Sequence, residues 1–182
     1  GAEMPSGNGP IAALHPIEEL YRAMEDKSVT LLRAGYFYIN FYNDIPLLEA
    51  SGILGGNLAA DTALPLVHPD DIAAAAWAEM KKPAEGRLAT DIRYIVSDVQ
   101  TPAAIATAIG NALGKPQLAY LPFSDEQMEQ GMLQAGVPAE IASLYTEMGR
   151  GLREGKIQQH FLDTYRAVEG ATKLDAFAQQ FA

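Results

Sequence analysis

The chain has 182 residues, of which 48% are apolar and 20% charged, the mixture of a globular domain rather than of a disordered segment. Its net charge of −10 and its 13 scattered Lys and Arg residues argue against a nucleic-acid partner. The absence of cysteine excludes disulfides, thiolate catalysis and zinc–cysteine sites. No apolar run reaches the roughly 18 residues of a membrane span, and residues 1–10 lack the features of a signal peptide, so we expect a cytoplasmic protein without a membrane anchor.

The first part of the sequence alternates helical and strand patterns. Pro10 suits the start of a helix, and apolar residues then recur at helical spacing as far as Met24. The apolar run Val29–Arg33 follows a short turn and predicts a buried parallel strand. We expect the aromatic segment 36–42 to be helical, and residues 52–67 to form loops and short strands around their glycines.

The later part of the sequence predicts two further helix–strand steps and then helices. Asp70 is expected to cap an alanine-rich helix over residues 73–80, and residues 91–96 alternate as a strand. Thr101 and Pro102 suit the start of a helix that ends before Gly114. A strand is expected next, followed by helical patterns almost to the C-terminus; these segments are 117–121 for the strand and about 124–135, 138–150, 157–168 and 173–181 for the helices.

This order of elements predicts an α/β fold. A doubly wound nucleotide-binding domain normally begins with a strand and a glycine-rich turn, whereas this chain begins with a loop and a helix. Neither G-x-G-x-x-G nor the phosphate-binding G-x-x-x-x-G-K-S/T occurs. The glycine groups at 7–9 and 52–56 do not open a helix after a convincing strand. We therefore expect no nucleotide cofactor to bind tightly to this chain alone.

Residues 32–40, Leu-Arg-Ala-Gly-Tyr-Phe-Tyr-Ile-Asn, carry a resemblance to a known family. Together with His15 and Glu19 on the preceding helix, this segment resembles the NmrA-like family of atypical short-chain dehydrogenase/reductase proteins. Residues 64–73, 100–115 and 172–177 also resemble that family. The resemblance implies the C-terminal two thirds of an NAD(P)-binding domain: a Rossmann-like parallel sheet plus a small, mostly helical substrate-side subdomain.

The same resemblance implies how the chain is divided. Residues 1–122 would be the C-terminal part of the NAD(P)-binding domain with its substrate-side insertions. Residues 123–182 would be the helical subdomain. The N-terminal part with the phosphate loop would be absent from this chain. Because half of such a domain exposes sheet edges and apolar faces, we expect a homo-oligomer or a missing N-terminal segment.

His15 and Glu19 are the candidate catalytic residues. They lie four residues apart and hence on one helix face, where ordinary short-chain dehydrogenases present a Tyr and a Lys. His15 can donate a proton near neutral pH, but Glu19 cannot supply the charge of the Lys. This difference argues against alcohol-dehydrogenase chemistry. The alternative is a partly exposed His beside a surface Glu at the start of a helix.

The aromatic segment supplies the candidate binding residues. By resemblance, Gly35, Tyr36 and Phe37 would lie beside the nicotinamide, although core packing explains the aromatic rings equally well. Asn40 is the candidate substrate-binding residue, because a polar side chain inside an aromatic segment needs a buried partner. Arg33, at the end of a buried strand, is expected to pair with a carboxylate or carbonyl for structural reasons.

The sequence gives little indication of a metal site or of a catalytic nucleophile. His68, Asp70 and Asp71 form the tightest His/Asp group, but the start of a helix makes capping a better explanation than a metal site, and no metal is expected. No G-x-S-x-G nucleophile motif occurs, which argues against acyl transfer.

The function that the resemblance implies is that of an NAD(P)H-dependent reductase, acting in its full-length form on a quinone or a similar small electrophile. The chain alone is expected to be inactive. One alternative is a non-catalytic NAD(P)-sensing regulator or protein-interaction domain, and another is a truncated product without cofactor binding. The identity of the substrate and the choice between NAD and NADP are not encoded in these residues.

Overall fold

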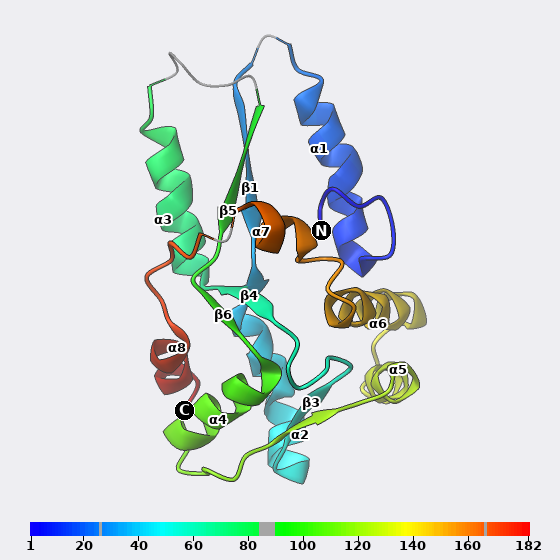
Figure 1. Cartoon of the computed structure of the whole chain (residues 1–182). Coiled ribbons are helices and arrows are strands. Elements are labelled where there is room, and N and C mark those ends of the chain that lie inside the picture. The colour runs from blue at the N-terminus through cyan, green and yellow to red at the C-terminus, as the bar shows by residue number, and fades with distance from the viewer. Residues whose placement is uncertain (26, 84–89, 166) are drawn as a thin grey trace.

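Short strand pairs flanked by helices make up the fold (Figure 1). The computed structural model describes residues 1–25, 27–83, 90–165 and 167–182. Within these ranges the predicted α/β class is confirmed, with strands and helices that alternate along the chain. No helix of the described residues is long and apolar enough to cross a membrane.

The strand pairs join segments that lie far apart in the sequence. The parallel pairs are β1 (Val29–Ala34) with β5 (Thr90–Ile95), β2 (Tyr36–Phe37) with β4 (Leu64–Val67), and β3 (Leu54–Gly56) with β7 (Tyr120–Pro122). A short strand that the sequence did not indicate, β6 (Asp98–Gln100), pairs with β4 in the antiparallel direction. The described strands therefore form three separate small sheets: the β2–β4–β6 sheet is mixed, and the β1–β5 and β3–β7 sheets are parallel.

Gly35 is the point at which the chain changes strand partner. β1 pairs with β5, and the Gly35 amide continues that pairing by donating to the Ile95 carbonyl at 3.0 Å. Directly after it, Tyr36 pairs with Leu66 of β4. A Cβ atom at Gly35 would lie 2.6 Å from the Pro65 carbonyl oxygen, so the close approach of the two strands requires glycine.

Helices and 3₁₀ turns occupy most of the remaining chain. They are η1 (Gly9–Ala13), α1 (Leu14–Arg22), η2 (Tyr38–Asp44), α2 (Ile45–Ser51), α3 (Pro69–Met80), α4 (Pro102–Ala112), α5 (Asp125–Gln134), α6 (Ala139–Arg153), α7 (Gln159–Thr164) and α8 (Leu174–Phe181). The expected first helix is divided into η1 and α1. The aromatic segment 36–42 begins as strand β2 and continues as η2, because pairing with β4 overrides its local preference.

Helix capping follows the sequence in one case and differs in another. The Thr101 hydroxyl accepts from the Ala104 amide at 3.2 Å and caps α4, as predicted. The cap of α3 is His68, whose Nδ1 accepts from the Asp70 amide at 3.2 Å, so the prediction of Asp70 as the cap is wrong. The described residues contain no group of three or more His, Asp or Glu side chains arranged to hold a metal ion.

The main hydrophobic core lies where η2 meets α4 and α8. Tyr38 is fully buried and stacks on Phe177, with ring centroids 4.9 Å apart. Phe41 is also buried, and its ring centroid lies 6.3 Å from that of Phe177. Core packing therefore accounts for Tyr38 and Phe41, whereas the Phe37 side chain is 37% exposed.

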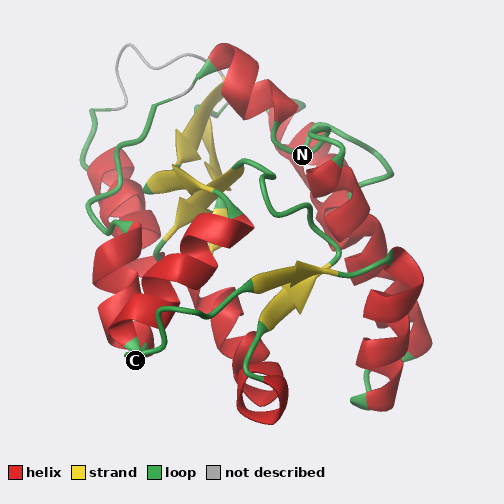
Figure 2. Cartoon of the chain, turned by 60° about the horizontal axis from the view of Figure 1, so that its bottom comes forward, coloured by secondary structure: helices red, strands yellow, loops and turns green. Residues whose placement is uncertain are grey.

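The last third of the chain is helical after β7, with α5 and α6 beyond the β3–β7 pair (Figure 2). Asp125 ties α5 to α6, because its carboxylate accepts from Arg150 at 2.6 Å and from Arg153 at 2.9 Å. Hydrogen bonds from these arginines hold the pKa of Asp125 well below its ordinary value.

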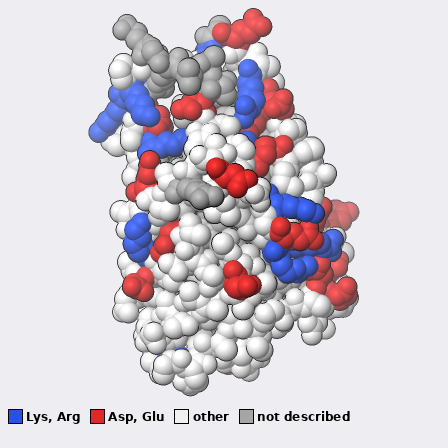
Figure 3. Space-filling model, in the orientation of Figure 1, with Lys and Arg blue, Asp and Glu red and all other residues white. Residues whose placement is uncertain are grey.

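Charged side chains of both signs gather at this edge of the molecule, while the lower part of the same face is nearly uncharged (Figure 3). The division of the chain at residue 122 stays a prediction.

Candidate functional site

Three side chains at four-residue spacing follow the partner change at Gly35. Tyr36 lies on β2, and Asn40 and Asp44 lie on η2; all three are partly buried. Burial raises the pKa of Tyr36, and a smaller effect from interaction with the Asn40 side chain lowers it. The charges of Asp44 and of Tyr120, on β7, interact with the Tyr36 hydroxyl. We call these four residues the Tyr36 cluster.

The hydroxyl groups of the Tyr36 cluster are held in an apolar surrounding. Tyr36 packs on the Phe41 ring at 5.6 Å, and burial raises its pKa far above the ordinary value for tyrosine. The Tyr120 hydroxyl lies 3.3 Å from both the amide and the carbonyl of Leu58, and burial raises the pKa of Tyr120 to about 12. Both phenols therefore stay protonated at neutral pH and can act as hydrogen-bond donors.

Asp44 is the unusual member of the Tyr36 cluster. It occupies the N-cap position of α2, yet its side chain makes no capping hydrogen bond. The carboxyl forms no hydrogen bond or ion pair with any described residue. Burial raises the pKa of Asp44 to about 7. The side chain remains partly accessible to solvent.

The predicted catalytic residues lie elsewhere, on α1. His15 is partly exposed and Glu19 is exposed, with its carboxylate 3.8 Å from the Arg22 guanidinium. No hydrogen bond, ion pair or ring contact between described residues joins either one to Tyr36 or Asn40. The structure thus brings the predicted residues Tyr36 and Asn40 together, but it links neither to the predicted His–Glu pair.

The buried acid of α1 is Glu18, the neighbour of the predicted Glu19. Arg33 holds it in a two-pronged pair, with Nε–Oε1 at 2.9 Å and Nη2–Oε2 at 2.6 Å. Arg33 Nη1 also donates to Glu3 at 2.6 Å and to the Tyr94 hydroxyl oxygen at 2.9 Å. The expectation of a structural partner for Arg33 is confirmed. Sequence reasoning missed Glu18, although it lies four residues before Arg22 on the same helix face.

Tyr94 extends this pair to α7. Its hydroxyl oxygen lies 2.8 Å from His160 Nδ1. The Tyr94 oxygen accepts from Arg33 at the same time, and His160 Nδ1 donates or accepts according to the imidazole tautomer. The Arg33 network therefore connects the N-terminal loop, α1, β1, β5 and α7.

An apolar face and a free strand edge lie next to each other at β1. Only β5 pairs with β1 among the described strands, which leaves the second edge of β1 unpaired. α1 runs beside β1 (Figure 1) and exposes apolar side chains along its length. The α1 apolar face consists of Leu14 (48% exposed), Ile17 (48%), Leu20 (64%) and Tyr21 (44%) on α1, together with Met24 (37%) just after the helix ends.

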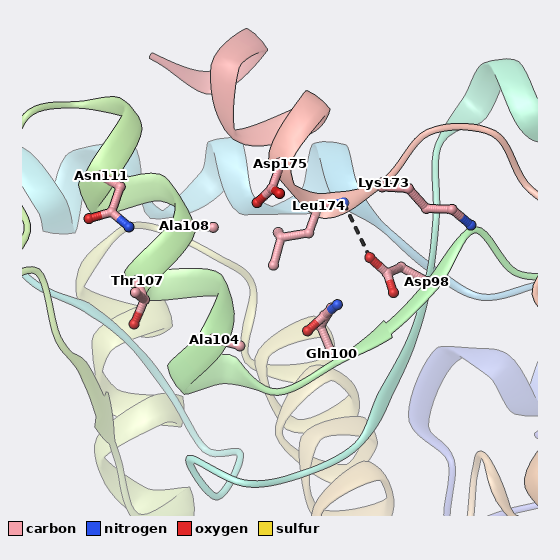
Figure 4. Close-up of a pocket in the computed structure, with 9 residues that line it drawn as sticks. All are labelled: Asp98, Gln100, Ala104, Thr107, Ala108, Asn111, Lys173, Leu174 and Asp175. Atoms are coloured by element: carbon pink, nitrogen blue, oxygen red, sulfur yellow. Dashed lines mark hydrogen bonds between the residues drawn. The ribbon is translucent and has the colours of Figure 1, made fainter.

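A separate polar groove lies between β6, α4 and α8 (Figure 4). Its volume is about 350 Å³, and none of the sequence-predicted site residues lines it. The Asp98 carboxylate accepts from the Leu174 amide at 3.3 Å, which fixes the start of α8 beside it. Lys173 points away from the groove, where its ammonium donates to the Ser97 carbonyl at 2.5 Å. The charged groups at this groove are thus largely engaged in holding α8.

Comparison with known proteins identifies the fold. No family model and no curated protein matches the sequence. Solved structures do match: the NADPH-dependent quinone oxidoreductase of Escherichia coli, complexed with NADPH, superimposes with a TM-score of 0.75 at 20% identity. That match covers 95% of this chain and 60% of the oxidoreductase, so the chain spans about 60% of its length.

Two further structures agree. The triphenylmethane reductase of Citrobacter sp., complexed with NADP(H), matches with a TM-score of 0.75 and 21% identity over 95% of this chain and 60% of the reductase. NmrA, a negative transcriptional regulator complexed with NADP, matches with a TM-score of 0.66 and 15% identity over 93% of this chain and 52% of NmrA. The chain therefore has the Rossmann-like fold that NmrA-like, NAD(P)-binding proteins share, as the resemblance in residues 32–40 predicted.

Proposed function

We propose that this chain is the substrate-side part of an NAD(P)H-dependent reductase that acts on a quinone or a similar small electrophile. The observation that carries the proposal is the Tyr36 cluster. It offers aromatic surface, an amide, two neutral phenols and one titratable carboxyl, and it directly follows the strand partner change at Gly35. An acceptor of hydride needs such a site for positioning more than it needs a nucleophile.

The residues around Gly35 fit the nicotinamide end of a cofactor. The exposed Phe37 ring offers an aromatic surface next to Tyr36. A reduced nicotinamide bound there would supply the hydride. The partly buried amide of Asn40 would orient a substrate oxygen. His15 stays a candidate proton donor on α1, and Glu19, exposed beside it, a candidate partner.

The phosphates of the cofactor require a part that the described residues do not supply. We propose that the unpaired edge of β1 and the α1 apolar face bind this nucleotide-binding part. A parallel strand added to β1 would satisfy its free amide and carbonyl groups, and a covering element would bury the exposed apolar side chains. In each of the NADPH-bound and NADP(H)-bound reductases, about 40% of the chain lies outside the match.

The α1 apolar face makes a testable prediction. The chain of 182 residues is expected to self-associate in light scattering and to bind a hydrophobic dye. Leu20→Glu is expected to reduce both signals, since Leu20 is the most exposed member of the face at 64%. Ile141→Glu, on α6 and 42% exposed, is the matched control and should leave both signals unchanged. A chain that is monomeric and binds no hydrophobic dye would contradict the proposal that the α1 apolar face is a binding surface.

Cofactor and quinone titrations test the reductase proposal. The polypeptide encoded by the gene, including any residues before Gly1, is expected to quench its fluorescence with NADPH and to oxidise NADPH when 1,4-naphthoquinone is added. The chain of 182 residues alone is expected to do neither. NADPH binding without turnover across a panel of quinones would instead favour the NAD(P)-sensing regulator, which the fold match to NmrA supports. No binding by the gene's polypeptide would refute both.

A further inference from the structure

We draw no further inference here: the strongest candidate, the polar groove between β6, α4 and α8, carries none, because Asp98 is engaged in holding the start of α8 and none of the described residues that line the groove has a buried polar side-chain atom left unpaired for a ligand.

Discussion

Replacing Arg33 by Met is expected to lower the free energy of unfolding by about 3–5 kcal/mol. The substitution keeps the length of the side chain but removes the guanidinium that holds Glu18 and Glu3. Glu18 is 8% exposed and would be left as a buried carboxylate with little compensation. The Tyr94 hydroxyl would lose its donor as well, so contacts from α1 and β5 would weaken together.

Urea denaturation followed by circular dichroism measures this loss. Arg22→Met is the matched control, because Arg22 approaches the same Glu18 oxygen at 3.4 Å but its side chain is 36% exposed. Its effect should stay below about 1 kcal/mol. The double variant Arg33→Met with Glu18→Leu should recover most of the stability, since no unpaired charge remains. Equal effects of Arg33→Met and Arg22→Met would contradict the importance assigned to the buried pair.

The pH dependence of the same variant gives an independent check. Burial opposes ionisation of Glu18, but the hydrogen bonds from Arg33 outweigh it and lower the pKa of Glu18 below 4.5. A carboxyl whose pKa is lower in the folded state than in the unfolded state stabilises the fold at pH values above its unfolded-state pKa. This stabilisation is lost as the pH falls through the folded-state pKa. Without Arg33, the buried carboxyl can protonate at acid pH. The stability difference between wild type and Arg33→Met should therefore shrink as the pH is lowered below about 4.5.

Gly9→Ala is expected to cost about 2–5 kcal/mol of unfolding free energy. Gly9 has a φ of +60°, which costs a residue with a Cβ about 1–2 kcal/mol. The added Cβ would also overlap the Leu144 carbonyl oxygen and lie 2.9 Å from the Met148 Cβ on α6. Relieving this overlap would move η1 away from α6, at a further cost of about 1–3 kcal/mol.

Gly7→Ala separates the two contributions to the Gly9 effect. Gly7 also has a positive φ, of +80°, but the nearest atom to an added Cβ is the Met4 Cε at 3.9 Å. Its substitution should cost only the backbone strain of about 1–2 kcal/mol. Thermal unfolding of both variants should thus show the larger loss for Gly9→Ala, and a reversed order would mean that the close packing of η1 on α6 is wrong.

Local signals predicted the regular parts of the fold. The apolar run before Arg33 formed β1, and Thr101 capped α4 where the sequence placed the cap. Ser124 begins α5 with a reciprocal hydrogen-bond pair to Gln127, near the predicted start. The pairing of segments that are distant in the sequence was harder to predict. The antiparallel β4–β6 pair depends on where two short strands meet in space, and single strands of three or four residues carry little pattern of their own.

The candidate site was predicted in part. Asn40 stood out because a polar residue inside an aromatic segment needs a partner, and its side chain interacts with Tyr36. Asp44 was not identified from the sequence, because its burial is a property of the folded chain. The interaction of Tyr120 with Asp44 could not have been predicted from the sequence, because β7 and η2 come close together only in the folded chain. The buried acid of α1, Glu18, was not identified from the sequence, since its burial depends on Arg33 from the next element.

The parallel pairing of β1 has a consequence for synthesis of the protein. Arg33 on β1 and its partner Tyr94 on β5 are 61 residues apart. At about 5–20 residues per second, β1 leaves the ribosome roughly 3–12 s before β5 is available. During that interval both edges of an apolar strand are open, far longer than the microseconds in which a hairpin closes. We therefore expect chaperones to protect this strand of the nascent chain until β5 has been synthesised.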